Sequence, residues 1–252
     1  MRGRWACMGM IAWVCWFAGP VAWAAEVSVA VAANFAAPMK RLAVAFEHAS
    51  GHRTVVSVGA TGALYAQAVH GAPFEVFLGA DQATAQRLQS QGLAVQGSAN
   101  TYAIGRLVLW SAQPDLVDPQ GEVLRTARFQ RLALANPKLA PYGAAAYEVL
   151  HRKGLLEAWR HRLVQGDNIA QAHQFTASKN AALGFLALSQ VVVDGRLTHG
   201  SAWVVPSDLH SPLKQDMVLL KRGANAPAAY AFMEFMRSPA ARAIIRAHGY
   251  ED

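Results

Sequence analysis

Residues 27–62 read VSVAVAANFAAPMKRLAVAFEHASGHRTVVSVGATG, and the succession of apolar patterns in this stretch indicates the fold class. The short apolar run at 27–32 is typical of a buried strand, residues 35–49 have the spacing of an amphipathic helix, and 53–58 read as a second strand. Gly51 ends the helix before the second strand begins. A strand, a helix and a strand at this spacing predict a right-handed βαβ unit in a parallel sheet.

The same alternation continues through the rest of the chain. Further strands are expected at 74–78, 102–110, 131–135, 162–165, 183–188 and 216–221. Further helices are expected at about 62–70, 82–91, 143–153, 170–180, 226–236 and 239–248. The pattern predicts an α/β protein with two lobes, each a mainly parallel sheet flanked by helices, and a ligand cleft between them. We assign residues 25–105 and 207–252 to lobe I and residues 106–206 to lobe II.

The N-terminus has the features of an export signal. Arg2 and Arg4 precede an uncharged apolar run, which is followed by Pro20 and the small residues of Ala22-Trp23-Ala24. About 20 uncharged residues could also anchor a chain in a membrane, but Pro20 and the Ala-x-Ala site favour cleavage. We therefore predict a signal peptide over residues 1–24, cleaved after Ala24 or Ala25, and a periplasmic mature protein.

Composition agrees with an exported globular protein. The chain has 252 residues, of which 53% are hydrophobic and 15% charged, so it can bury a core and is not disordered. Both cysteines, Cys7 and Cys15, lie in the expected signal, so the mature chain has no thiol to oxidise outside the cytoplasm. Removal of Arg2 and Arg4 lowers the net charge from +7 to +5.

The candidate binding residues lie where strands give way to helices, because open α/β sheets bind ligands at the carboxyl ends of their strands. Four such junctions are small or glycine-rich and hold no Lys or Arg: Ala32–Phe35, Gly59–Gly62, Ala140–Gly143 and Gly166–Ile169. Asn34, Thr61 and Tyr142 add neutral donors to the exposed N–H groups of the helix ends, which favour an anion. Ordinary helix capping by Asn and Thr is the alternative interpretation.

Several motifs resemble the periplasmic molybdate-binding proteins of ABC importers, within the two-domain periplasmic binding proteins. The resemblance covers essentially the whole mature chain and rests on AANF at 32–35, GATG at 59–62, GAPFEVFLGAD at 71–81, YAIGRLVLW at 102–110, NPKLAPYG at 136–143 and LGF at 183–185. It implies two α/β domains that close on a tetrahedral oxyanion, molybdate or tungstate, and deliver it to ABC permease subunits. It implies no cofactor and no enzyme activity, and we expect a monomer.

The same resemblance implies the anion ligands. They are Ala33 and Asn34 in the first loop, Ala60 and Thr61 in the second, Tyr142 in the Pro-Tyr-Gly turn and the Ile169 amide. Many family members have serines in the first two loops, where this chain has Asn34 and the Ala60-Thr61 pair. Some members have a ligand tyrosine at the position of Ala187, so here Tyr142 would supply the phenol.

The chemistry of these positions independently favours a fully ionised anion. Hydrogen phosphate needs an acceptor for its proton, whereas the matched positions carry donors only. Asp167 is the one acid nearby, and we expect it to cap its helix and point away from the anion. Sulfate has the same charge and symmetry as molybdate, so a receptor of the same fold for sulfate or another small anion remains an alternative.

Other functions have weaker support. The nine histidines form no metal motif, and no metal cation is expected. Ser178 and Lys179 are the nearest approach to a nucleophile and base, so an exported hydrolase is the alternative from a different class. The basic residues are scattered among acids and apolar residues, which is typical of a solvated surface rather than a nucleic-acid interface.

Overall fold

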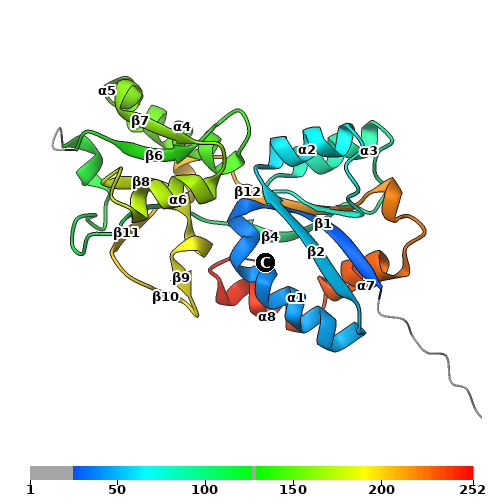
Figure 1. Ribbon diagram of the computed structural model, residues 1–252. Helices are drawn as coiled ribbons and strands as arrows, with labels where there is room; N and C mark the ends of the chain where they lie inside the picture. Colours follow the sequence, from blue (N-terminus) through cyan, green and yellow to red (C-terminus); the bar gives the residue numbers. More distant parts are fainter. Residues whose placement is uncertain (1–24, 127–128, 252) are drawn as a thin grey trace, which may run out of the picture.

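Two five-stranded sheets lie side by side in the computed structural model, which describes residues 25–126 and 129–251 (Figure 1). The strands of the first sheet, in spatial order, are β2 (Arg53–Gly59), β1 (Glu26–Ala32), β3 (Val76–Leu78), β12 (Leu213–Leu219) and β4 (Asn100–Gly105). Those of the second are β11 (Ser201–Val204), β5 (Leu107–Ser111), β8 (Leu183–Ala187), β6 (Leu132–Ala135) and β7 (Leu163–Gly166). We keep the names lobe I and lobe II for the parts built on the first and the second sheet. The expected signal at 1–24 lies outside the described residues.

Each sheet has four strands that point one way and one that is reversed. In lobe I, β12 runs antiparallel to both of its neighbours, β3 and β4. In lobe II, β5 runs antiparallel to β8 and β11. Both reversed strands are the ones that the chain enters when it crosses from the other lobe. The predicted fold class, two mainly parallel sheets flanked by helices, is confirmed.

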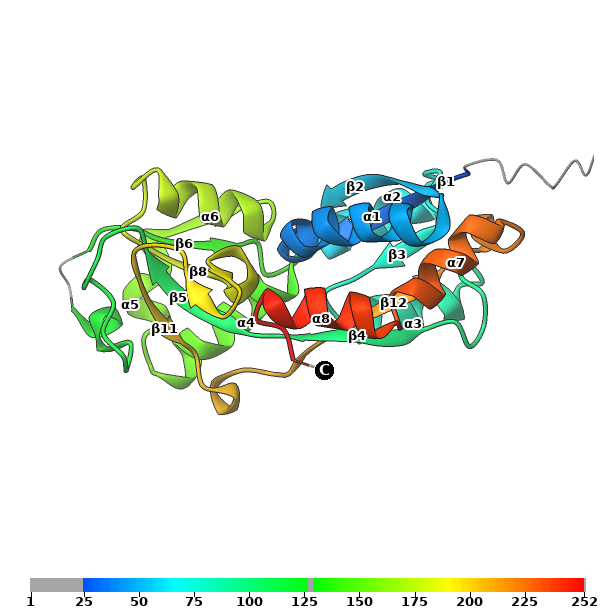
Figure 2. The same ribbon diagram turned by 90° about the horizontal axis from the view of Figure 1, so that it is seen from below.

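Helices cover both faces of the first sheet. Helices α1 (Ala36–Ser50), α7 (Pro227–Phe235) and α8 (Pro239–Ala247) lie on one side and α2 (Thr61–Val69) and α3 (Gln82–Ser90) on the other (Figures 1 and 2). Val29 and Val31 pack toward α1 and α7, whereas Ala30 between them packs toward α2 and α3. This alternation explains why residues 29–32 of β1 are all apolar, since helices cover both faces of the sheet there.

The second sheet is covered in the same way. Helices α4 (Pro141–Arg152) and α6 (Ile169–Ala177) both pack on β6 and β8 and lie on opposite sides of the sheet (Figure 2). A short helix, α5 (Leu156–Trp159), closes one end, where the buried Trp159 donates to the carbonyl of Leu124 at 2.9 Å. No helix in the described part of the chain has the length and apolar character needed to cross a membrane.

The run at 102–110, expected as one strand, is divided between the two sheets. It breaks at Arg106, so β4 ends in lobe I and β5 begins in lobe II. The apolar pattern shows extended chain but does not show which sheet each half joins. The pattern also did not predict three short strands. Two of them, β9 (Val192–Val193) and β10 (Arg196–Leu197), pair as a hairpin outside both sheets, and the third, β11, is an edge strand of the second sheet.

Strand β12 begins three residues before the expected start at 216. The polar residues Lys214 and Gln215 lie before the expected start, and the pairing register with β4 shifts between Gln215 and Asp216. Both residues are buried. Their polar atoms are satisfied by side chains from other parts of the chain, which no local pattern records.

Candidate functional site

The four polar junctions converge on one cavity between the lobes. All six predicted residues line it, and the complete lining is Ala32, Ala33, Asn34, Gly59, Ala60, Thr61, Ala80, Ala140, Pro141, Tyr142 and Ile169. About 10 Å³ of it is open to the centre of a water-sized sphere, roughly the space that one water molecule needs. None of the lining residues carries a charge.

The first junction joins β1 to α1 through a single 3-10 turn, Ala33–Phe35. Asn34 is buried there, and its side-chain nitrogen donates to Gln215 Oε1 and to the Tyr250 hydroxyl, both at 2.9 Å. The expectation that this side chain is a free donor is therefore wrong, because both of its N–H groups are engaged. What the junction can offer a ligand is backbone N–H, since the first amides of a helix lack partners within it.

The second junction places Thr61 at the start of α2. Its hydroxyl oxygen accepts a hydrogen bond from the backbone N–H of Ala80 at 3.1 Å. The hydroxyl proton is not used in that bond, so it is available to an acceptor in the cavity. Ala60, the residue before the helix, has only backbone polar groups to offer a ligand.

Tyr142 lies in the first turn of α4, directly after Pro141, whose fixed φ favours a helix start. The phenol oxygen accepts a hydrogen bond from Gln215 Nε2 at 3.1 Å. Burial raises the pKa of Tyr142 well above its ordinary value, and the buried phenols of Tyr250 and Tyr102 reinforce the shift. The phenol therefore keeps its proton and can donate it to a ligand.

The fourth junction begins α6 with Ile169. The Asn168 side chain caps this helix, accepting from the N–H groups of Ala170 and Gln171 at 2.9 and 3.2 Å. This leaves the Ile169 N–H as the first-turn amide that the cap does not satisfy. The prediction that Asp167 caps the helix is wrong, because Asn168 occupies that position; Asp167 is exposed and does not line the cavity.

Direct contacts between the lobes enclose the cavity. The N–H of Gly62 on α2 donates to the carbonyl of Leu139 in lobe II at 2.9 Å. The Ser189 hydroxyl of lobe II donates to the carbonyl of Asn34 at 2.8 Å. The structure therefore has its two lobes in contact around the site.

Behind the cavity lies a buried polar network that the sequence analysis missed. Its members beyond the lining residues are Tyr102, Ser189, Gln215 and Tyr250. Gln215 links both lobes, because it bonds Asn34 of lobe I and Tyr142 of lobe II. No local signal marks Gln215, because it lies between the polar residues Lys214 and Asp216 and its partners lie far away in the sequence.

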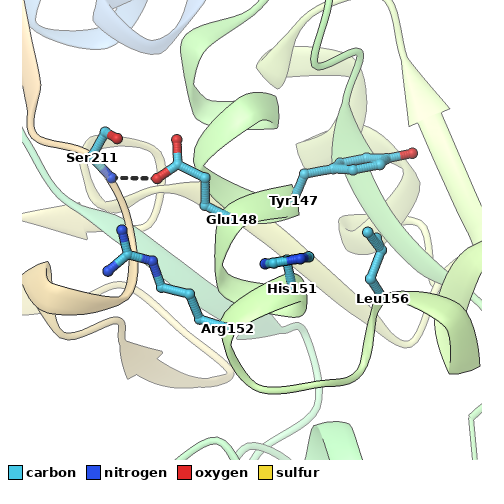
Figure 3. Close-up of a pocket in the computed structure, with 6 residues that line it drawn as sticks. All are labelled: Tyr147, Glu148, His151, Arg152, Leu156 and Ser211. Atoms are coloured by element: carbon cyan, nitrogen blue, oxygen red, sulfur yellow. Dashed lines mark hydrogen bonds between the residues drawn. The ribbon is translucent and has the colours of Figure 1, made fainter.

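A larger hollow lies elsewhere on lobe II and shares no residue with this cavity. It has a volume of about 480 Å³ and is lined by Tyr147, Glu148, His151, Arg152, Leu156 and Ser211 (Figure 3). Figure 3 shows Glu148 turned toward Ser211, whose N–H it accepts at 2.6 Å. Its residues come from α4, from the start of α5 and from the crossing segment that holds Ser211, so it is not where the junctions meet.

Two other candidate chemistries are not assembled. Within residues 25–126 and 129–251, no cluster of His, Cys, Asp or Glu could hold a metal ion. The Ser178 hydroxyl donates to the carbonyl of Phe175 at 3.3 Å, at the end of α6, rather than to a base.

Comparison with known proteins points in one direction. A family model for bacterial extracellular solute-binding proteins matches residues 27–251. The chain is 56% identical over 227 residues to the molybdate-binding protein ModA of Azotobacter vinelandii, covering 90% of each chain. It is 48% identical over 227 residues to ModA of Rhodobacter capsulatus, covering 90% of this chain and 88% of the relative. The solved periplasmic molybdate-binding protein of A. vinelandii superposes with a TM-score of 0.88 at 43% sequence identity, covering 90% of this chain and 99% of the other.

Proposed function

The chain belongs to the bacterial extracellular solute-binding protein family, and we propose that within it the protein captures molybdate for import by an ABC transporter. Its relatives from A. vinelandii and R. capsulatus carry the name molybdate-binding protein and match nine-tenths of the chain. The protein accordingly binds and releases its ligand without chemical conversion.

One observation carries the choice of ligand class: the cavity wall offers hydrogen-bond donors and no charge. The hydroxyl oxygen of Thr61 accepts from the Ala80 N–H, and that of Tyr142 accepts from Gln215 Nε2. The hydroxyl proton of each residue is therefore available to a ligand in the cavity. The helix-terminal amide of Ile169 adds a third donor. A wall of donors suits a fully ionised oxyanion and rejects one that still carries a proton, because no carboxylate is present to accept it.

We assign the individual contacts as follows. The backbone amides of Ala33, Asn34, Ala60 and Ile169 and the hydroxyls of Thr61 and Tyr142 surround the oxyanion. Helix N-termini stabilise the negative charge through their dipoles and their unpaired N–H groups, so the site needs no cation. Tungstate has the same charge and shape as molybdate and is a ligand of the same site.

Capture proceeds by closure of the lobes. The crossings between β4 and β5 and between β11 and β12 divide the chain into residues 25–105 with 207–252 and residues 106–206, and these two parts move against each other. An anion that contacts both lobes is bound more tightly by the closed arrangement, so it shifts the population toward closure. The permease subunits then recognise the closed form.

The protein acts after export. Relatives described as periplasmic support an exported protein, and the signal over residues 1–24 is cleaved after Ala24 or Ala25. We propose that the mature chain works as a monomer, because a single cavity between its own two lobes completes the binding site.

Isothermal titration of the purified mature protein tests the proposal. The titrants are molybdate, tungstate, sulfate and hydrogen phosphate at the same ionic strength. We expect strong binding of molybdate and tungstate and none of phosphate. Clear binding of sulfate without a signal from molybdate would instead make the protein a sulfate receptor of the same fold.

A further inference from the structure

Gln215 is a fully buried amide that lies behind the cavity wall without being part of it. Its Oε1 accepts from Asn34 Nδ2 at 2.9 Å and lies 3.0 Å from the Tyr102 hydroxyl, which shares its proton between Gln215 and the carbonyl of Gly79 at 2.9 Å. Its Nε2 donates to the Tyr142 phenol at 3.1 Å. The side chain therefore connects a residue of the first junction with the phenol of the third.

The direction of these hydrogen bonds is set by a backbone carbonyl. The carbonyl oxygen of Asn34 can only accept, and the hydroxyls of Ser189 and Tyr250 donate to it at 2.8 and 2.9 Å. The proton of Tyr250 is used in this way, so its oxygen accepts from Asn34 Nδ2 at 2.9 Å. The nitrogen end of the Asn34 amide therefore faces Tyr250 and Gln215.

The same logic then fixes Gln215 and Tyr142. Asn34 presents N–H to Gln215, so the Gln215 oxygen faces Asn34 and its nitrogen faces Tyr142. A phenol that accepts from Gln215 cannot also donate to it. The proton of Tyr142 is therefore not used by Gln215 and can turn toward the cavity, with the Tyr250 hydroxyl as the other oxygen that it can reach.

We propose that Gln215 is a positioning residue that holds the Tyr142 hydroxyl as a donor toward the oxyanion. The inference rests on the proposed function, because it concerns how this cavity recognises its anion. Gln215 belongs to β12 of lobe I and Tyr142 to α4 of lobe II, so the phenol is oriented only when the lobes meet. Closure thus completes one of the donors that the anion requires.

A double-mutant cycle tests the coupling between the two residues. Gln215→Met keeps the volume of the side chain but removes its hydrogen bonds, and Tyr142→Phe removes the hydroxyl. We expect Gln215→Met to weaken molybdate binding about 5- to 50-fold in the wild-type background and less than about twofold in the Tyr142→Phe background. Equal losses in both backgrounds would show a packing role only and would overturn the inference.

Gln215→Glu supplies a readout that a packing role does not predict. An ionised carboxylate can only accept, so it draws the Tyr142 proton away from the anion and affinity falls. Desolvation raises the pKa of a buried carboxyl, and the protonated form can again donate to the phenol. The other titratable groups around this position are Tyr102, Tyr142 and Tyr250, which burial keeps neutral, and the adjacent Asp216, which accepts from Thr101.

We therefore expect the affinity of the Gln215→Glu variant for molybdate to recover about tenfold or more between pH 8 and pH 6, while that of the wild-type protein stays level. A variant whose affinity does not change over this range would contradict the positioning role. Unfolding of each ligand-free variant is measured alongside, so that a folding defect is recognised. If Gln215→Glu does not fold, the double-mutant cycle still tests the inference, and if Gln215→Met does not fold, the pH dependence of Gln215→Glu does. Failure of the wild-type protein itself to bind any oxyanion would overturn the proposed function, a separate result.

Discussion

Gln215 of lobe I donates a hydrogen bond to the phenol of Tyr142 in lobe II at 3.1 Å, directly behind the cavity. The contact joins the reversed strand β12 to the first turn of α4. Tyr142 therefore belongs both to the wall of the site and to the contact between the lobes. Ligand affinity and lobe closure should consequently respond to the same substitutions.

Tyr142→Phe should weaken molybdate binding by about 1.5–3 kcal/mol, because a hydrogen bond to a charged group is lost. Tyr147→Phe is the matched control: this tyrosine lies on the same helix, but its hydroxyl accepts from Gln165 at 3.0 Å, outside the cavity. Titration calorimetry of both variants distinguishes them. An unchanged affinity for Tyr142→Phe would mean that this phenol does not touch the anion.

Thr61→Val should reduce molybdate affinity by a similar amount, about 1.5–3 kcal/mol, since it keeps the shape of the side chain and removes the hydroxyl. Thr61→Ser keeps the hydroxyl and should restore most of the binding. The valine variant also leaves the buried N–H of Ala80 without its acceptor, so its free energy of unfolding should fall by about 1–3 kcal/mol. If serine binds no better than valine, the hydroxyl is not a ligand.

Gly105→Ala should impair closure. A Cβ at this position would overlap the Tyr142 hydroxyl and lie 2.6 Å from Gln215 Nε2. Overpacking of this kind typically costs about 1–3 kcal/mol, so we expect weaker molybdate binding and, in small-angle scattering, a smaller decrease in the radius of gyration on ligand addition. In a Tyr142→Phe background the hydroxyl is gone, and Gly105→Ala should weaken molybdate binding less than it does in the wild-type protein. An equal loss of affinity in both backgrounds would mean that the added methyl group acts through a contact other than the Tyr142 hydroxyl.

The local parts of this fold and site follow from the sequence. Apolar spacing predicts β1 and α1, and nearby residues also determine the cap of α3, where Asp81 accepts from the N–H of Thr84. The small residues at strand ends likewise predict where backbone can approach a ligand. All six proposed ligand positions line the cavity for this reason.

The parts that depend on distant partners do not follow. Asn34 reads as a free donor because nothing near it in the chain reveals Gln215 and Tyr250, which occupy its amide. Gln215 itself lies before the expected start of its strand, and its partners Asn34, Tyr102 and Tyr142 come from three separate segments that its local sequence does not reveal. The break at Arg106 is missed for the same reason, because extended chain looks alike whichever sheet it joins.

The buried tyrosines should make the protein sensitive to alkali but leave binding insensitive to pH near neutrality. Burial raises the pKa of Tyr250 to about 12 and those of Tyr102 and Tyr142 well above the ordinary value of 10.0. Above about pH 10 these phenols ionise in the unfolded chain while the folded chain keeps them neutral. Unfolding therefore releases protons, and the free energy of unfolding should fall as the pH rises through this range.

Denaturant titrations at pH 8 to 11 measure that decline, and Tyr142→Phe should make it shallower because one phenol no longer contributes. Molybdate affinity should meanwhile stay level from about pH 6.5 to 9, because no charged residue lines the cavity and Tyr142 keeps its proton throughout. A step in affinity near pH 6.5 would point to a histidine that controls the site, and it would contradict a wall made of neutral donors.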